Sequence, residues 1–376
     1  LKIRASWGLL GNQSALNDFY PWLNTYNLDG TYMFGNSIKT GYYQKSYKLN
    51  TISWEKARTW GIGIDASLFN AIDLSVDYYD RKTTGIIMDV PVPNEFALDA
   101  YKDNVGAMIN RGVEVTLSYH KQWGDWKFGA TGNFAYNKNE LLDLGGVDSM
   151  VDPNDKYKRR QVGARLNSFY AYKADGFFNS DEEAQAWMDK YASQEGYPFG
   201  TNKFKGGDLI YQDTNNDGKM TEDDRVLLGS TDPSWTFGLN LNAGYKGFDL
   251  SVMFSGAADV SRMFTQPGDF NGDMSRPTTA WLDAWTPENK DAKMPRVAYE
   301  KKSPSHPWNN MSSFWIQNAS YVRLQNLQFG YTFPTEWLKA LHIETLRVYY
   351  SAENLFTIDN MMVNVDPESM DTNGYG

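Results

Sequence analysis

Two runs of alternating residues, 235–245 and 248–255, constrain the fold of this chain more than any other feature. In the first run, large apolar side chains from Trp235 to Tyr245 fall on one face and small or polar residues fall on the other. This pattern is typical of a strand with one apolar side. A turn at residues 245–247 precedes the second run, which alternates in the same way, so we expect an antiparallel hairpin.

The aromatic residues of the first run indicate which solvent its apolar face meets. That face begins with Trp235 and ends with Tyr245, about ten residues later, which is the length of a tilted transmembrane strand with an aromatic residue at each membrane interface. The opposite face, with Gly238, Asn240 and Asn242, is small and polar, as the wall of a water-filled lumen would be. We therefore predict that the apolar face contacts lipid.

The same alternation recurs along the chain and predicts a meander of roughly nine strands. Tight turns near Asn70, Gly124 and Lys246 alternate with long connections at about residues 8–56, 139–230 and 257–317. Short turns on one side and long extracellular loops on the other are typical of an outer-membrane barrel. A proline-bearing loop is expected at residues 91–106. Within the second long connection, Ser180 and Glu183 form a capping box for a helix predicted at residues 181–192.

Composition narrows the classes of protein further. No apolar run approaches the roughly 20 residues of a membrane helix, so a chain like this can span a bilayer only as a barrel. The 376 residues would suggest two or three domains by length, but 15% aromatic residues and 32 glycines favour one large β structure. A net charge of −10 argues against nucleic-acid binding. The absence of cysteine excludes disulfides, thiol catalysis and thiolate metal sites. Leu1 already lies in an alternating segment, and we expect that a further part of the protein precedes it.

An acidic stretch between residues 213 and 224 has the spacing of an EF-hand-type calcium loop. Alternating Asx side chains, a glycine for the sharp turn and a backbone carbonyl would supply the hard oxygens that calcium prefers. The residues at positions 1, 3, 5, 6, 7, 9 and 12 of such a loop are Asp213, Asn215, Asp217, Gly218, Lys219, Thr221 and Asp224. Aspartate replaces the usual glutamate at the last position. An acidic loop of Asx turns that holds the base of an extracellular connection is the alternative interpretation, and both stay open.

Aromatic residues crowd the last long connection. They are Trp281, Trp285, Trp308 and Trp315, with Tyr299. Flat aromatic faces can stack on sugar rings or on peptide side chains, and they also fill the centres of protein interfaces. We favour contact with a lid protein, or packing within the loop, over direct contact with a ligand.

Motifs for catalysis are weak. The GxGxxA pattern from Gly61 to Ala66 lies inside an alternating strand rather than at a turn into a helix, so it does not predict a dinucleotide site. The three histidines, His120, His306 and His342, have no zinc spacing, and no Ser, His and Asp motif is visible. We predict that the protein is not an enzyme. Polar residues that could line a substrate path are Asn133, Asn137, Asn240, Asn242 and Arg347.

Several segments taken together resemble a known family. They are LKIRASWGLLGNQ, NRGVEVTLSY, SFYAYKADGFF, GDLIYQDTNNDGKMTEDDRVLLGSTDPSWTFGLN, ASYVRLQNLQFGYTFP and LRVYYSAENLFTI. In this order, and from end to end of the chain, they closely resemble the C-terminal half of the barrel in SusC/RagA-type TonB-linked outer-membrane transporters of the Bacteroidetes.

The resemblance implies an all-β, antiparallel transmembrane barrel of about 22 strands, a plug domain and a TonB box. Residues 1–376 would form the C-terminal part of that barrel, without the plug, the TonB box or the closing strand. Such proteins lie in the outer membrane of Gram-negative bacteria beneath a SusD-like lipoprotein lid. They import oligosaccharides or oligopeptides with energy from the TonB complex, which would act through the missing N-terminal part.

The sequence is also compatible with two other functions. One is a soluble, secreted β protein that binds glycans in a calcium-dependent way through its tryptophan-rich loops. The other is a passive porin, which the resemblance and the long aromatic loops both disfavour.

Overall fold

A computed structural model gives the fold of the chain. It describes residues 1–13, 20, 22–44, 47–49, 51–90, 92, 94–96, 98–152, 155–201, 203–264, 279–298, 303–307, 309–362 and 365–368.

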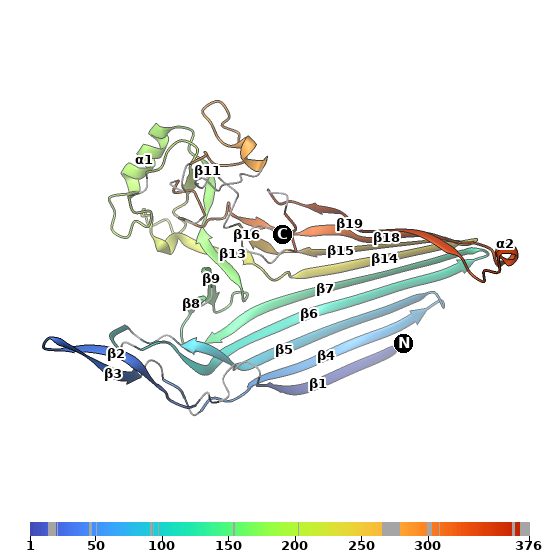
Figure 1. The fold of residues 1–376 in the computed structure, drawn as a ribbon, viewed down its shortest axis with the longest axis horizontal. Coiled ribbons are helices and arrows are strands. Elements are labelled where there is room, and N and C mark those ends of the chain that lie inside the picture. The colour runs from blue at the N-terminus through green and yellow to red at the C-terminus, as the bar shows by residue number, and fades with distance from the viewer. Residues whose placement is uncertain are drawn as a thin grey trace.

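A nine-stranded antiparallel sheet dominates the structure (Figure 1), which confirms the number of strands expected from the alternation. Its strands, in spatial order, are β1 (Lys2–Asn12), β4 (Glu55–Leu68), β5 (Ile72–Val90), β6 (Tyr101–Trp123), β7 (Trp126–Leu144), β14 (Trp235–Tyr245), β15 (Phe248–Ala258), β18 (Tyr321–Thr332) and β19 (Arg347–Asp359). The sheet is open, with β1 and β19 at its two edges.

Tight hairpin turns join these strands at one end of the sheet, as predicted. The turn between β14 and β15 places Lys246 and Gly247 at φ +44° and +91°, and the turn between β4 and β5 places Asn70 at φ +50°. Positive φ angles at both central residues match the right-handed twist of the flanking strands. A short helix, α2 (Thr335–Leu338), and a 3₁₀ turn at Lys339–Leu341 connect β18 with β19 at this same end.

The β5–β6 hairpin is longer than the alternation suggested. β5 continues to Val90 and β6 begins at Tyr101, so the connection is residues 91–100 rather than the predicted 91–106. Register shifts near Ile86 interrupt the strict alternation, and Gly85 there has φ +66°. A bulge of this kind breaks the alternation of apolar and polar side chains, although the pairing of the strands continues. The alternation in the sequence therefore ends before the strands do.

The first long connection carries its own two-stranded hairpin. The strands β2 (Tyr26–Phe34) and β3 (Ser37–Gln44) pair with each other, apart from the main sheet. Figure 1 shows them projecting beyond the end of the main sheet that lies opposite the tight turns.

The other two long connections fold together into a compact body, here called the loop lobe, made of the described residues of 149–230 and 261–318. Its strands are β8 (Ser149–Asp152), β9 (Asp155–Gln161), β10 (Ser168–Tyr172), β11 (Ala174–Phe177), β12 (Leu209–Tyr211), β13 (Arg225–Ser230), β16 (Ser261–Met263) and β17 (Ile316–Asn318). The lobe lies at the end of the sheet opposite the tight turns (Figure 1).

The predicted helix is present in this lobe as α1 (Asp181–Tyr191). The Ser180 hydroxyl accepts a hydrogen bond from the backbone N–H of Glu183 at 3.3 Å, and the Glu183 carboxylate accepts one from Asn179 N–H at 2.6 Å. The buried residues Ala184, Met188 and Tyr191 form the face that packs on the lobe core. The capping signal and the apolar spacing together explain why a helix forms here.

Candidate functional site: a two-faced wall and its loop lobe

One face of the main sheet is apolar from edge to edge, because directly paired residues in an antiparallel sheet point to the same side. A single row across the nine strands consists of Ile3, Ile64, Val76, Val115, Phe134, Phe237, Gly256, Val322 and Ile358. Several of these side chains, such as Ile64 and Phe134, are exposed. A continuous exposed apolar surface of this extent needs a lipid or protein cover.

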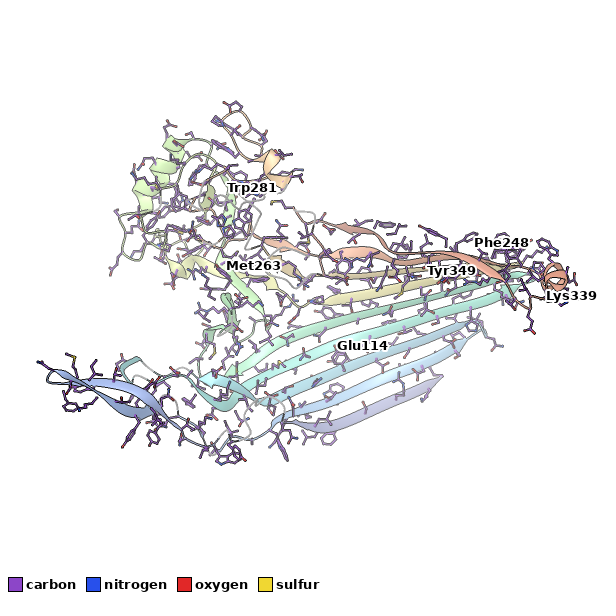
Figure 2. All side chains as sticks on the ribbon, in the orientation of Figure 1. Glu114, Phe248, Met263, Trp281, Lys339 and Tyr349 are labelled. Carbon is purple, nitrogen blue, oxygen red and sulfur yellow. The ribbon has the colours of Figure 1, made fainter. Side chains whose placement is uncertain are left out.

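Aromatic side chains gather at both ends of this apolar face. At the end near the lobe, the Trp235 ring lies 4.1 Å from the Tyr136 ring between centroids. At the end with the tight turns, the rings of Trp126 and Tyr245 stack at 4.2 Å between centroids. Phe248, at the same end (Figure 2), pairs in register with Tyr245. Ten residues of a strand tilted by about 40° span roughly 25 Å, the height of the apolar band in outer-membrane barrels.

The other face of the sheet is polar. The row next to the apolar row described above consists of Lys2, Asp65, Ser75, Thr116, Asn133, Gly238, Ser255, Arg323 and Thr357. The five residues predicted to lie on a polar wall, Asn133, Asn137, Asn240, Asn242 and Arg347, all belong to this face. Whether they contact a substrate stays a prediction.

Side chains on the polar face bond to each other across strands. Arg4 on β1 donates to Asp65 Oδ1 and to Asp77 Oδ2, each at 2.8 Å, and so links three neighbouring strands. Gly63 lies between these groups, and a Cβ atom there would lie 2.1 Å from Asp77 Oδ1. Glycine therefore makes room for the ion pairs. Sequence reasoning missed this cluster because alternation gives the face of a residue but not the register between strands.

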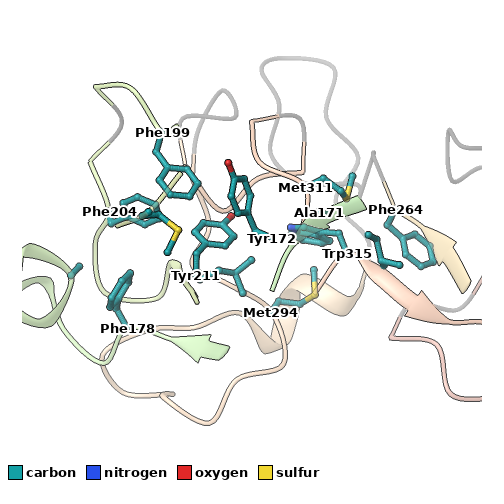
Figure 3. Packing of buried hydrophobic residues seen from close by; sticks show 14 of the residues in the cluster. Ala171, Tyr172, Phe178, Phe199, Phe204, Tyr211, Phe264, Met294, Met311 and Trp315 are labelled. Carbon is teal, nitrogen blue, oxygen red and sulfur yellow. The ribbon is translucent and has the colours of Figure 1, made fainter. Parts of the chain in front are cut away.

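The loop lobe has its own hydrophobic core, which draws residues from both long connections (Figure 3). Phe199 stacks on Tyr211 with ring centroids 4.9 Å apart. Trp315, only 2% exposed, donates its indole N–H to the Ser305 carbonyl at 2.7 Å. Two sequence-distant loops thus form one folded body.

Three of the four candidate tryptophans belong to this lobe and are buried. Trp281 and Trp285 are each 9% exposed, and Trp315 less still. Trp308 lies outside the described residues, as does Tyr299. Burial favours packing within the loops, which was one of the two preferred interpretations, whereas contact with a lid or a substrate stays a prediction.

A buried carboxylate, Asp208, joins the two connections. It is fully buried and accepts hydrogen bonds from the Ser303 and Ser305 hydroxyls at 2.5 and 3.2 Å and from the Lys205 N–H at 2.9 Å. Arg296 Nε lies 3.0 Å from Oδ2, the oxygen that also accepts from Lys205, as an ion pair. Burial raises the pKa of Asp208, and this effect outweighs the lowering by Arg296 and Ser303.

The acidic loop of residues 213–224 folds as a series of Asx turns. Asp213 Oδ2 accepts from Gly218 N–H at 2.9 Å, and Asp217 Oδ1 accepts from Lys219 N–H at 2.7 Å. Gly218 has φ +80°, as the sharp turn requires. The other oxygen of Asp213, Oδ1, is buried without a hydrogen-bond partner.

The last residue of that loop, Asp224, is fully buried. Its two carboxylate oxygens accept the backbone N–H groups of Thr214 at 2.9 Å and Thr221 at 2.8 Å. Thr221 forms a capping box with it over the 3₁₀ turn Glu222–Asp224. Asp224 thus closes the loop through backbone contacts.

No group of three or more His, Cys, Asp or Glu side chains in the described parts of the chain is arranged to hold a metal ion. None of the helices in those parts has both the length and the apolar character needed to cross a bilayer.

A sheet with an apolar outer face between two aromatic belts and a polar inner face is the wall of a transmembrane β-barrel. The chain belongs to the TonB-dependent receptor-like β-barrel family, whose model matches residues 1–259. The all-β barrel class, the membership of this family and the location in a Gram-negative outer membrane are thereby confirmed.

Relatives cover nearly the whole chain. TonB-dependent receptor P3 of Formosa agariphila is 27% identical over 382 residues, which is 98% of this chain and 36% of the relative. TonB-dependent receptor SusC of Bacteroides thetaiotaomicron is 27% identical over the full chain and 36% of its own length. The chain therefore spans little more than a third of the curated relatives that it matches.

Solved structures agree with this assignment. The structure of the RagAB peptide transporter is 26% identical, with a TM-score of 0.71, over 97% of this chain and 38% of the other. The RagAB peptide importer in its open-open state gives 25% identity and a TM-score of 0.73. The predicted SusC/RagA-type resemblance is thus confirmed.

Proposed function

We propose that this chain forms part of the barrel of a TonB-energised importer that carries oligosaccharides or oligopeptides across the outer membrane. The main support for this proposal is the nine-stranded sheet, here called the wall, which has one apolar and one polar face. It has a large folded lobe at one end and only short turns at the other. In outer-membrane barrels the short turns are periplasmic, and we infer from this that the lobe and the β2–β3 hairpin lie outside the cell. The names of the relatives, which are receptors and transporters, support import rather than catalysis.

A SusD-like lipoprotein over the lobe is the partner that this proposal includes. The lobe is a folded body with its own core at the outer end of the wall, where a lid would dock. The likeness to SusC and to the RagAB peptide transporter supports a partner of this kind. In a closed barrel, the free edges of β1 and β19 would pair with further strands, since unpaired backbone groups are costly in lipid.

The soluble, calcium-dependent glycan-binding alternative is less well supported. A soluble protein would have to cover the apolar row that runs from Ile3 to Ile358, because large exposed apolar surfaces drive association in water. A passive porin would present the same wall, but the family of receptors to which the chain belongs disfavours it.

Isolation of the native protein from outer membranes in mild detergent tests the proposal. Mass spectrometry should give an intact mass of about 120 kDa, as expected for a relative of which this 42.8 kDa chain matches 36%. A co-purifying lipoprotein, and detection of bound oligosaccharide or oligopeptide, would identify the partner and the substrate. A species of 42.8 kDa that stays soluble without detergent would contradict the barrel and favour the soluble binding protein.

A further inference from the structure

A patch of basic side chains lies on the lipid-facing side of the wall, just beyond the aromatic belt near the lobe. The belt row on strands β5–β7 and β14 contains Tyr78, Tyr136 and Trp235. One row further out, Arg111 on β6 pairs in register with Lys138 on β7. One row beyond that, Arg58 on β4 pairs with Lys82 on β5. Strands β4 to β7 lie side by side (Figure 1), so the four cations share one outward surface, here called the basic patch.

The register fixes the outward direction of these side chains. Leu9 on β1 pairs with Arg58 and Ile109 on β6 pairs with Lys82, so this row continues the apolar face. The row of Arg111 also contains Trp7 and Trp60 on the outward side, and the Trp60 ring lies 5.4 Å between centroids from Tyr78 of the belt row. Each row lies about 5 Å further along the membrane normal for a strand tilted by about 40°. The basic patch therefore lies at the level of the lipid headgroups, where phosphate groups are found.

Only part of the charge in the basic patch is balanced by the protein. Asp80 pairs with Arg111 at 2.8 Å, and Glu140 pairs with Lys138 at 3.3 Å. No carboxylate among the described residues forms an ion pair with Arg58 or Lys82. Like charges directly opposite each other destabilise a sheet, so this pair favours an anion from outside the protein.

The basic patch is local rather than a general property of the rim. The neighbouring strands β14 and β15 stop at the belt row, where their paired residues Trp235 and Ala258 are uncharged. At the opposite end of the outward face, Lys121 on β6 forms no ion pair with any residue that the structure describes, and Lys246 pairs with Asp125 at 3.4 Å. The protein has a net charge of −10, yet the basic patch carries a local excess of positive charge.

We propose that the basic patch binds a phosphorylated lipid headgroup of the outer leaflet, with Arg58 and Lys82 as its main contacts. A guanidinium group can donate two parallel hydrogen bonds to one phosphate, and an ammonium group adds a compact positive charge. Trp60 and Trp7 beside them offer rings that pack on the adjoining apolar and sugar parts of a lipid. This lipid site is separate from import, but it rests on the orientation proposed above, in which the lobe lies outside the cell.

Native mass spectrometry of the full-length protein, with any subunits that co-purify, tests this site. The probes are bisphosphorylated lipid A, the same lipid after removal of its phosphates, and inorganic phosphate as a competitor. The double variant R58Q/K82Q should bind bisphosphorylated lipid A about thirtyfold more weakly than the parent, because each basic side chain at a membrane surface strengthens binding about fivefold. The single variants R58Q and K82Q should each bind bisphosphorylated lipid A about fivefold more weakly than the parent. They keep the proposal testable if the double variant fails to assemble.

The matched control is K121Q/K246Q, which removes two positive charges from the same outward face at its other end. The proposal expects parental affinity for bisphosphorylated lipid A in this control and no binding of dephosphorylated lipid above detergent background. Equal losses in R58Q/K82Q and the control would overturn the site, as would equal binding of both lipids. Displacement of the lipid by inorganic phosphate would show a site for the free ion instead. Loss of lipid binding with unchanged substrate binding would separate this site from the proposed import function.

Discussion

Arg165 and Asp259 form an ion pair where the loop lobe meets the main sheet, with Nη1 of the arginine 2.8 Å from Oδ2 of the aspartate. The same guanidinium also donates to the backbone carbonyls of Asp232 and, at 3.2 Å, of Asp259. Asp232 lies between β13 and β14, and Asp259 lies between β15 and β16. One side chain thus bonds to two of the segments that link the wall with the lobe.

Replacing Arg165 by glutamine should loosen the base of the lobe without unfolding the wall. The change removes hydrogen bonds to two carbonyls and an ion pair that is partly exposed, a loss of about 1 kcal/mol. Hydrogen exchange in the full-length protein should show lower protection at residues 231–234 and 259–262. Lys102→Gln breaks an exposed pair with Asp89 at 3.1 Å on the wall and serves as the control. Equal protection of the lobe base in both variants would contradict this role of Arg165.

The buried carboxylate of Asp208 should make the stability of the lobe fall as the pH rises. Burial raises its pKa above the ordinary value of 3.8, so the folded lobe holds this proton more tightly than the unfolded chain does. The stabilisation is complete below about pH 3.8 and is lost as the pH rises through the raised pKa. Between about pH 3.5 and 7, the unfolding temperature of the lobe should therefore depend less on pH in the Asp208→Asn variant than in the parent. An unchanged slope in this variant would show that other groups set the pH dependence.

The strands of the wall were predictable because each alternates with a period of two over the full width of a membrane. The run from Trp235 to Tyr245 predicts which side of the strand is apolar and which residues lie in the aromatic belts. It also predicts where the next turn begins. Where a bulge shifts the phase, as near Ile86, the sequence signal ended before the strand did. Each strand meets lipid on one side and polar groups on the other, and these two environments determine its alternation of side chains. The alternation can therefore be read from the strand's own sequence.

The loop lobe could not be predicted in the same way. Its core joins Tyr211 of one long connection with Trp315 of another, and no periodicity relates two segments so far apart in sequence. Asp208 is a further example, since its partners Arg296 and Ser303 come from the other connection. The sequence marked the aromatic residues as notable, but only the packing shows that three of the tryptophans are core residues.

Replacing Gly63 by alanine should disturb the ion pairs on the polar face. The new methyl group would lie 2.1 Å from Asp77 Oδ1 and 2.9 Å from Arg4 Nη2, so the carboxylate must move, at a cost of about 1 to 3 kcal/mol. The temperature at which the barrel loses its compact, heat-modifiable mobility on a detergent gel should fall. Gly129→Ala provides the control, because the nearest atom to its Cβ would be 3.8 Å away. Equal unfolding temperatures for the two variants would argue against crowding at Gly63.

Trp281 and Leu282 are adjacent in sequence but differ in burial, which allows packing to be separated from surface contact. Trp281 is 9% exposed and Leu282 is 88% exposed, and Figure 2 shows Trp281 within the lobe. Trp281→Ala should destabilise the lobe by about 3 to 5 kcal/mol, measured by proteolysis of the native protein, and Leu282→Ala should leave its stability unchanged. A Trp281→Ala variant with a stable lobe but lost binding of the co-purifying lipoprotein would instead favour the lid-contact role.

Calcium is expected to stabilise the acidic loop if Asp213, Asn215 and Asp217 bind it together with the Lys219 carbonyl. Asp213 keeps one oxygen without a hydrogen-bond partner, whereas both oxygens of Asp224 already accept backbone N–H groups. Calcium at a hundred times its dissociation constant should then raise the stability of the lobe by about 2.7 kcal/mol, and a chelator should reverse the gain. Asp213→Asn should remove most of this effect, and Asp223→Asn, in the same loop but at a non-coordinating position, should retain it. If calcium leaves the melting temperature of the parent unchanged, Asx turns alone hold the loop.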